Sequence, residues 1–140
     1  MATQIQVTFD CADPARLAEF WAQALGYVQQ GPPEGFDSWE SWLTAMGIPE
    51  KDWTNACVDP DGVGPRLLFQ RVPEPKSVKN RVHLDVNVAH GLSGAAQHTR
   101  VNEEVERLTQ LGAEKVREVE ERGEHWVVMQ DPEGNEFCLQ

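Results

Sequence analysis

A turn of the form Asp-Pro-acid-Gly occurs twice in the 140-residue chain, and this repetition restricts the possible folds more than any other feature. The first copy, Asp59–Gly62, precedes the run Gly64–Gln70, and the second, Asp131–Gly134, precedes Asn135–Gln140. Proline presets φ inside such a turn, and glycine tolerates the positive φ that closes it. Each turn therefore introduces a predicted strand ending on glutamine, and the chain is predicted to contain two similar halves.

The beginnings of the two halves also match. Ile5–Cys11 and Val82–Val88 both alternate apolar and polar residues, which is typical of strands with one buried face. A helix with an apolar face follows each strand, the first from the Asp13 cap to Gly26 and the second from about Thr99 to Gly112. Further strands complete each half in the order strand–helix–strand–strand–strand.

These patterns predict one α+β domain over residues 1–140, built from two tandem βαβββ modules. Module 1 covers about residues 1–72 and module 2 about residues 80–140, with a stiff linker at 73–79 that contains Pro73 and Pro75. Because a module of about 70 residues buries too little surface to be stable alone, we expect the two modules to share one core.

Module 1 carries a Trp-rich insertion at residues 31–53. Asp37 and Glu40 predict a capping box at the start of a short helix in this insertion. One face of that helix then carries Trp39, Trp42, Leu43 and Met46. The helix has three possible roles: a plug for one end of the sheet, an aromatic lid over a ligand, or a docking surface for another protein.

The composition limits the partners. A formal net charge of -11 disfavours nucleic acids and anionic membranes, and it favours cationic or neutral small molecules. The N-terminus lacks the basic start and apolar run of a signal peptide, and no run is long enough for a membrane-spanning helix. Three cysteines without a CxxC pair predict neither a disulfide framework nor a zinc knuckle. We therefore expect a cytoplasmic protein.

A tandem βαβββ unit with Asp-Pro-acid-Gly-Asn before its last strand resembles the vicinal oxygen chelate superfamily. This superfamily includes glyoxalase I, extradiol dioxygenases, and fosfomycin- and bleomycin-resistance proteins. The resemblance implies a curved mixed sheet around a cleft, and it implies a homodimer, because members often pair. The segments most similar to its small glyoxalase-like domains are Val7–Trp21, Gly62–Gln70, Lys79–Val88 and Asp131–Gln140.

The resemblance also implies where a divalent metal would be bound. Members that use a metal take ligands from the first and last strands of each module, at positions that correspond here to Gln6 and His83, and to Leu68 and Cys138. Gln6 and His83 match the residue types of the family, whereas the family has Glu at the other two positions. Hard divalent ions prefer carboxylates, and an isomerising glyoxalase needs a Glu to move a carbon-bound proton. The sequence therefore argues against glyoxalase I chemistry.

Other polar residues share a strand face with these positions, because residues two apart on a strand point the same way. Together with the two tryptophans of the insertion, they complete a set of candidate ligand-binding residues. This set consists of His83, Asp85, Glu136, Arg66, Thr8, Cys138, Trp39 and Trp42.

Two interpretations of these residues remain open. His83, Asp85 and Glu136 loosely imitate a facial metal site, with one histidine instead of two. Alternatively, His83 is a neutral histidine bonded to Asp85 or Glu136, and Arg66 pairs with Glu136. The other histidines are weaker candidates: His90 and His98 flank a loop at 89–98 and are predicted to be solvated, and His125, at the start of a strand, faces either water or the cleft.

The leading functional hypothesis is a glyoxalase-like protein that binds or processes a small molecule. The first alternative is a metal-dependent lyase, isomerase or dioxygenase that uses Gln6, His83 and nearby carboxylates. The second is a metal-free protein that sequesters a drug of the bleomycin type. The sequence alone leaves open the ligand, the metal and whether the protein is a catalyst.

Overall fold

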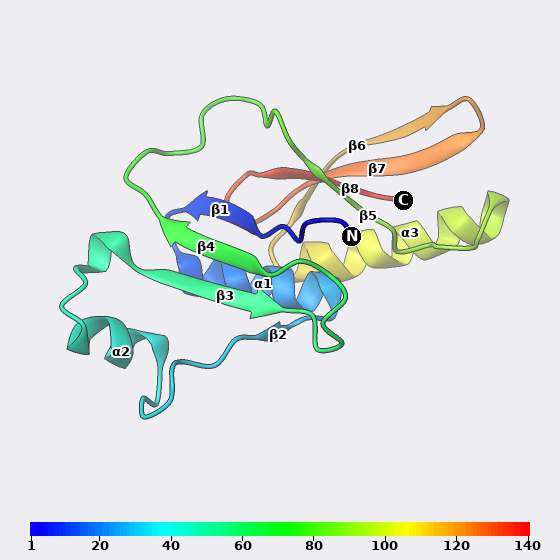
Figure 1. The fold of residues 1–140 in the computed structure, drawn as a ribbon. Helices are drawn as coiled ribbons and strands as arrows, with labels where there is room; N and C mark the ends of the chain where they lie inside the picture. Colours follow the sequence, from blue (N-terminus) through cyan, green and yellow to red (C-terminus); the bar gives the residue numbers. More distant parts are fainter. The chain divides into compact units, whose positions relative to one another are not determined.

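In the computed structural model, which describes residues 1–140, the chain divides into two units with one four-stranded sheet each. The first unit is Met1–Pro75 and the second is Lys76–Gln140. Helices and strands are both present in each unit (Figure 1), so the predicted α+β class is confirmed. No helix combines the length and the apolar character needed to cross a bilayer.

The sheet of the first unit has the order β1-β4-β3-β2, with β1 and β4 parallel and the other neighbours antiparallel. Its helix α1 packs on one face of this sheet, where Leu17 and Trp21 are fully buried. The elements are β1 (Val7–Cys11), α1 (Pro14–Leu25), β2 (Val28–Gln29), α2 (Trp39–Ala45), η1 (Glu50–Asp52), β3 (Thr54–Val58) and β4 (Leu67–Arg71).

The predicted limits of α1 are confirmed. The Asp13 side chain accepts a hydrogen bond from the Arg16 backbone N–H at 3.2 Å, and Gly26 ends the helix with a left-handed φ of 70°. The ring of Phe9 lies 5.2 Å from that of Trp21 and 5.2 Å from that of Phe69, so aromatic side chains join the helix to the paired strands β1 and β4.

The insertion contains a short helix, α2, but its predicted cap is wrong. The cap is Ser38, whose hydroxyl accepts from the Ser41 N–H at 3.0 Å, while the Ser41 hydroxyl accepts from the Ser38 N–H at 3.2 Å. Leu43 is buried as expected, whereas Met46 is 60% exposed. Met46 leaves the predicted apolar face because α2 ends at Ala45.

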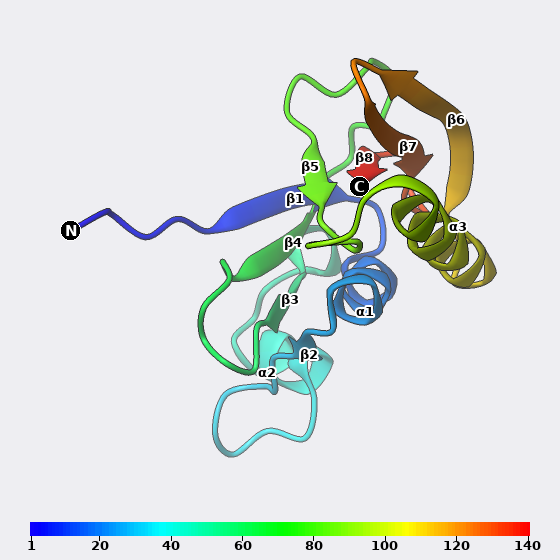
Figure 2. The same ribbon diagram turned by 90° about the vertical axis from the view of Figure 1, so that its right-hand side faces the viewer.

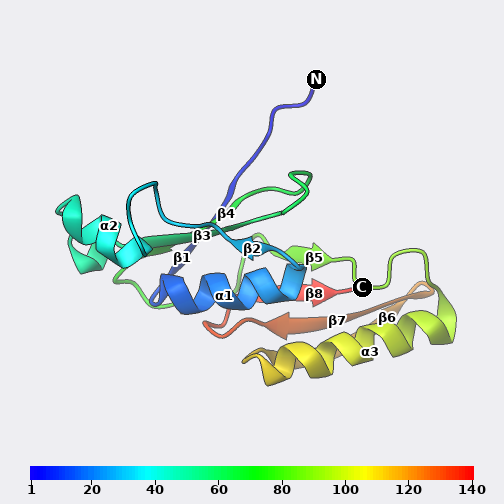
Figure 3. The ribbon, with the colours of Figure 1, turned by 90° about the horizontal axis from the view of Figure 1, so that it is seen from below.

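The second unit repeats the arrangement, with sheet order β5-β8-β7-β6 and a parallel pair β5 and β8. Helix α3 packs on one face of this sheet, alongside the β6–β7 hairpin (Figures 2 and 3). The elements are β5 (Leu84–Val86), α3 (Gly94–Gln110), β6 (Glu114–Glu121), β7 (Glu124–Gln130) and β8 (Glu136–Leu139).

Helix α3 begins at Gly94, earlier than the predicted start near Thr99. Ser93 occupies the cap position, and the residues that follow include Ala95 and Ala96, which have the highest helix propensity. The predicted loop at 89–98 is therefore helical over its second half.

The repeated turn has the same geometry in both units. The Gly62 N–H donates to the Asp59 carbonyl at 3.0 Å, and the Gly134 N–H donates to the Asp131 carbonyl at 2.9 Å. Both glycines have positive φ, 70° and 86°. The strand registers are also equivalent, because Thr8 pairs with Leu68 as Asp85 pairs with Cys138. The predicted internal repeat is confirmed down to single positions.

Candidate functional site

The two faces of the second sheet have different chemistry. On the face covered by α3, the side chains of Val127, Met129, Phe137 and Leu139 are fully buried. Strand residues alternate between faces, so Trp126, Val128 and Cys138 point to the face away from α3. The candidate site lies on this second face.

A row of four paired residues crosses the face away from α3. Asp85 pairs with Cys138, Cys138 pairs with Val128, and Val128 pairs with Arg117. Directly paired residues point to the same side of a sheet, so four strands place these side chains next to one another. We call Asp85, Cys138, Val128 and Arg117 the cross-strand row.

His83 extends the row at its β5 end. Its Nε2 atom lies 3.3 Å from Asp85 Oδ1, and both side chains are about half exposed, at 45% and 49%. The ligand atoms of His83, Asp85 and Cys138 all lie within 4.8 Å of one another. Three of the predicted site residues are thus brought together, with the His83 ring next to the Asp85 carboxylate.

The thiol of Cys138 is held in its protonated form. Burial is the main reason that its pKa rises to about 11, and the neighbouring Asp85 carboxylate, which accepts its hydrogen bond, raises this pKa further. The positive charges of Lys79 and Arg117 act in the opposite direction. The row therefore presents a neutral thiol between a carboxylate and a guanidinium at neutral pH.

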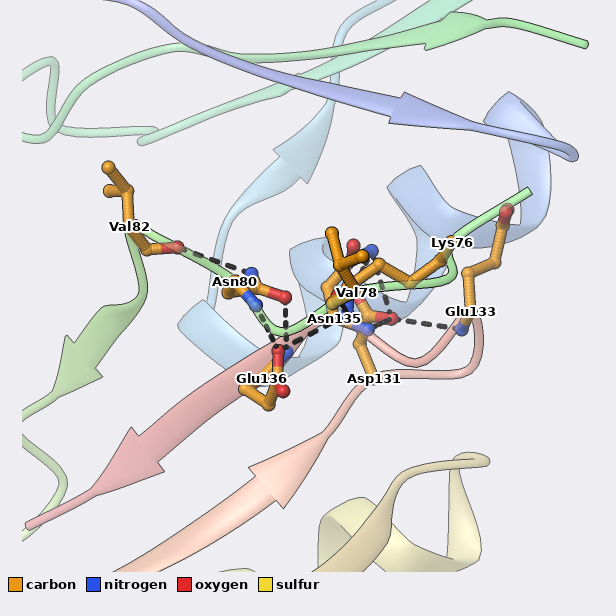
Figure 4. Close-up of polar contacts among 8 residues, drawn as sticks. All are labelled: Lys76, Val78, Asn80, Val82, Asp131, Glu133, Asn135 and Glu136. Atoms are coloured by element: carbon orange, nitrogen blue, oxygen red, sulfur yellow. Dashed lines mark hydrogen bonds and ion pairs between the residues drawn. The ribbon is translucent and has the colours of Figure 1, made fainter. Parts of the chain in front are cut away.

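Glu136, a predicted ligand-binding residue, is occupied by the chain segment that precedes β5 (Figure 4). Its carboxylate accepts the Asn80 backbone N–H at 3.0 Å and pairs with Lys76 Nζ at 3.5 Å. Burial acts to raise the pKa of this carboxyl, but the hydrogen bond from Asn80 and the charge of Lys76 lower it overall. Within the second unit, Glu136 thus fastens residues 76–80 to the start of β8.

The predicted residues of the first unit gather around Arg66. Its Nε donates to Gln30 Oε1 at 2.7 Å and its Nη1 donates to Gln6 Oε1 at 2.8 Å. The Gln6 amide lies 3.5 Å from the Thr8 hydroxyl. Both partners of Arg66 are neutral amides, so its hydrogen bonds leave the positive charge uncompensated.

The insertion contacts this cluster through one tryptophan. The Trp39 indole N–H donates to the Gln30 backbone carbonyl at 2.6 Å, and the Trp39 and Trp42 rings meet edge to face at 5.7 Å. Both tryptophans are half-buried. The indole of Trp39 therefore fixes the residue whose side chain holds Arg66.

Sequence reasoning did not assign to the site five residues that contact or charge its predicted members: Gln30, Lys76, Lys79, Asn80 and Arg117. Arg117 is displaced by a register shift between Lys115 and Arg117, which strict alternation does not foresee. Gln30 lies just after the end of the short strand β2, and the hydrogen bond of its N–H to the Ala56 carbonyl at 2.9 Å extends the pairing of that strand with β3.

The donor atoms of the second sheet fit some metals and not others. His83, Asp85 and Cys138 supply one nitrogen, one carboxylate and one thiol, a set suited to a borderline ion such as Zn²⁺. A hard ion such as Mn²⁺ prefers oxygen ligands, and Leu68, the counterpart of Cys138 in the first unit, supplies no donor atom. The residues do not fit a hard ion.

Comparison with known proteins gives a match over nearly the whole chain. A family model described as a glyoxalase-like domain matches residues 6–140. Among curated proteins, none matches the chain.

Similar solved structures cover almost all of the chain at low identity. A mutant of the fosfomycin resistance protein FosX from Listeria monocytogenes, complexed with Mn(II) and 1S,2S-dihydroxypropylphosphonic acid, has a TM-score of 0.67 and 13% identity, covering 100% of this chain and 92% of its own. A glyoxalase/bleomycin resistance protein/dioxygenase family enzyme from Burkholderia phytofirmans has a TM-score of 0.62 and 14% identity, with coverages of 96% and 94%. A hypothetical protein from S. aureus has a TM-score of 0.60 and 14% identity, with coverages of 99% and 96%. At these identities the likeness concerns the fold.

Proposed function

Because the chain belongs to the family of glyoxalase-like domains, we propose that it binds or processes a small molecule at the cross-strand row. The observation that carries this proposal is the chemistry of the row and of His83 beside it. An imidazole, a carboxylate, a thiol and a guanidinium lie on neighbouring strand positions. A small number of polar groups, held close together on a rigid sheet, can orient a small ligand.

Arg66, in the first unit, offers a binding group of its own for an anion. Its guanidinium is held by two neutral amides and keeps its full charge, so it is suited to an anionic group such as a phosphonate or a carboxylate. The FosX structure similar to this chain holds a phosphonic acid. We therefore place phosphonates among the first ligands to test, together with bleomycin as a cationic one.

Glyoxalase I chemistry is not part of the proposal. The isomerisation needs a carboxylate that moves a carbon-bound proton, and the two family positions for it hold Leu68 and Cys138. Leu68 has no titratable group, and the raised pKa of Cys138, about 11, keeps its thiol from acting as a base near neutral pH.

The test is a ligand titration followed by tryptophan fluorescence and calorimetry. For a ligand that binds, Asp85→Asn and Arg117→Gln are each expected to weaken affinity by at least about tenfold, or 1.4 kcal/mol. Lys115→Gln is the matched control, because Lys115 lies on the same strand but on the other side of the register shift. Equal affinities for all three variants and the wild type would contradict the assignment to the row.

A second candidate function is metal-dependent catalysis, favoured by the three donor atoms of His83, Asp85 and Cys138 within 4.8 Å. These residues would hold a borderline ion, which supplies Lewis-acid polarisation of a substrate oxygen when bound. His83→Asn, in protein purified without a His-tag, is expected to contain one equivalent of zinc less than the wild type. The same zinc content in both proteins would exclude this function, and His90→Asn serves as the control.

We also propose a cytoplasmic homodimer. Cys11, Cys57 and Cys138 are all buried and none of them forms a disulfide, which suits a reducing compartment. Light scattering of the purified chain tests the dimer, and a monomeric mass at micromolar concentration would contradict it.

A further inference from the structure

A second group of metal-ligating side chains lies on the opposite face of the second sheet, under α3. It consists of His98 from α3, Glu118 from β6 and His125 from β7, whose ligand atoms all lie within 4.8 Å of one another. The rings of His98 and His125 stack with centroids 3.8 Å apart. We call these three residues the hairpin cluster.

The hairpin cluster is separate from the cross-strand row. His125 alternates in phase with Val127 and Met129, whose side chains are fully buried on the face covered by α3. Asp85 and Cys138 point to the other face. His98 lies on a helix and not in the predicted loop, and His125 faces neither water nor the cleft, because it is buried on the side of α3 with 6% exposure.

The hydrogen bonds of Gln97 fix where the His125 ring carries its proton. The Gln97 amide nitrogen donates to the His125 backbone carbonyl at 2.9 Å, so the amide oxygen must be the atom 2.8 Å from His125 Nδ1. An amide oxygen only accepts hydrogen bonds, and Nδ1 therefore carries a hydrogen. The lone pair of the neutral ring is left on Nε2.

That lone pair faces a carboxylate. His125 Nε2 lies 2.7 Å from Glu118 Oε1, and Lys115 Nζ lies 3.6 Å from the other oxygen of this carboxylate, so a proton or a cation is needed only at the contact of Nε2 with Oε1. A second ring proton would satisfy this need, and so would a metal ion. A histidine that donates its far N–H to a fixed oxygen is the arrangement found for metal-ligating histidines.

The surroundings favour the metal ion. The imidazole of His98 stacks on that of His125 and brings a second nitrogen to the same place, and its Nε2 lies 3.4 Å from Glu120 Oε1. Two imidazoles and one carboxylate are a common set for a borderline divalent ion. Metal bonds of 2.0–2.2 Å put ligand atoms about 3.3 Å apart in a tetrahedral site. The half-exposed Glu118 side chain can move so that its Oε1 atom lies about 3.3 Å from His125 Nε2, in place of 2.7 Å.

The cluster lies at the edge of a cavity within the second unit. This cavity has a volume of about 420 Å³, and its lining includes both histidines of the cluster, His90, Glu120 and Trp126. With three protein ligands, an ion at the cluster keeps a further position for water or for a molecule in the cavity.

We propose that His98, Glu118 and His125 bind a borderline divalent metal ion, with Zn²⁺ as the probe, at the rim of this cavity. The His125 Nδ1–H, held by Gln97, orients the ring, and Nε2 is the ligand atom. This site is independent of the small-molecule function proposed above.

Zinc titration against a chromophoric chelator tests the proposal, in the His83→Asn background so that the cross-strand row does not contribute. We expect one zinc site per chain in this background. Adding His98→Asn is expected to weaken that site by more than about 100-fold, because even an outer-shell partner of a metal is worth 10–100-fold. Adding His90→Asn, which changes the same cavity but not the cluster, is expected to leave it unchanged.

The side-chain exposure of His98 is 36%, so its replacement is compatible with folding, which thermal unfolding of the metal-free variants checks. Nitrogen NMR of the histidine rings gives a second readout. On zinc addition, the His125 Nε2 signal is expected to move to the metal-bound range while Nδ1 keeps its proton. Absence of zinc binding in His83→Asn, or retention of it after His98→Asn, overturns the proposal.

Discussion

Removing the carboxylate of Asp131 is expected to destabilise the protein strongly. This side chain is 3% exposed and closes the turn before β8. It accepts the backbone N–H of Glu133 at 2.9 Å and of Asn135 at 3.0 Å, and the Asn135 side-chain amide at 2.9 Å. A hydrogen bond to a charged group contributes about 1.5–3 kcal/mol. Because the donors are only half-buried, each of these three hydrogen bonds should contribute near or below the lower end of that range. Asp131→Ala should therefore lose about 3–4 kcal/mol.

Urea unfolding measures this loss as a change in the extrapolated free energy of unfolding. Asp131→Asn should lose less, about 1–2 kcal/mol, because it keeps one acceptor oxygen. Its new amide faces the amide of Asn135, so it still loses the contact at Oδ2. The order wild type, Asn variant, Ala variant is the expected ranking of stability.

The equivalent turn of the first unit provides the matched control. The Asp59 carboxylate accepts three backbone N–H groups, from Asp61 at 2.9 Å, Val63 at 3.1 Å and Gly64 at 2.7 Å, but it is partly exposed. Water replaces lost partners more easily there, so Asp59→Ala should cost less than Asp131→Ala. An equal or larger loss at Asp59 would refute the reasoning that burial sets the value of the turn carboxylate.

Three further predictions concern titratable groups. The Gly64 N–H and its neighbours lower the pKa of Asp59. The stability advantage of the wild type over Asp59→Asn is therefore present above about pH 4 and is lost as the pH falls through the lowered pKa. Urea midpoints measured at several pH values will show this loss. Burial raises the pKa of Cys57 and of Cys138 to about 11, so both thiols should alkylate slowly at pH 8. For the same reason, the free energy of unfolding should fall as the pH rises between about 9 and 11. Fast alkylation at pH 8, measured by mass spectrometry, would contradict the raised pKa values. Glu104, 4% exposed, pairs with two arginines on α3, and Glu104→Gln should lower the thermal midpoint by several degrees, or about 1–2 kcal/mol.

The fold was predictable because its strongest signals are local. The Asp-Pro-acid-Gly turn needs only proline at its second position and glycine at its last, and both copies form the same turn. The limits of α1 follow in the same way from the Asp13 cap and Gly26. The cap of α2 failed because Asp37 and Ser38 are adjacent and equally suited to the position, and their residue types do not distinguish them.

The candidate site was only partly predictable, because it depends on pairing between distant strands. His83 and Asp85 could be placed together, since two residues apart on one strand share a face. Arg117 could not, because the register shift after Lys115 turns it to the other face. The hairpin cluster was harder still. His98 and His125 stack only because α3 begins at Gly94, and a helix started near residue 99 has no defined direction for the His98 side chain.

The two halves have the same strand pairing but different side chains at equivalent positions. Thr8 and Leu68 occupy in the first unit the paired positions that Asp85 and Cys138 occupy in the second. A site with equal ligands from both copies needs matching donors at these positions, and Leu68 supplies none. The donors are concentrated in the second copy, while the first copy contributes a cation held by amides. The two copies therefore suit different ligand groups: Asp85 in the second copy suits a basic or hydrogen-bond-donating group, and Arg66 in the first copy suits an acidic one.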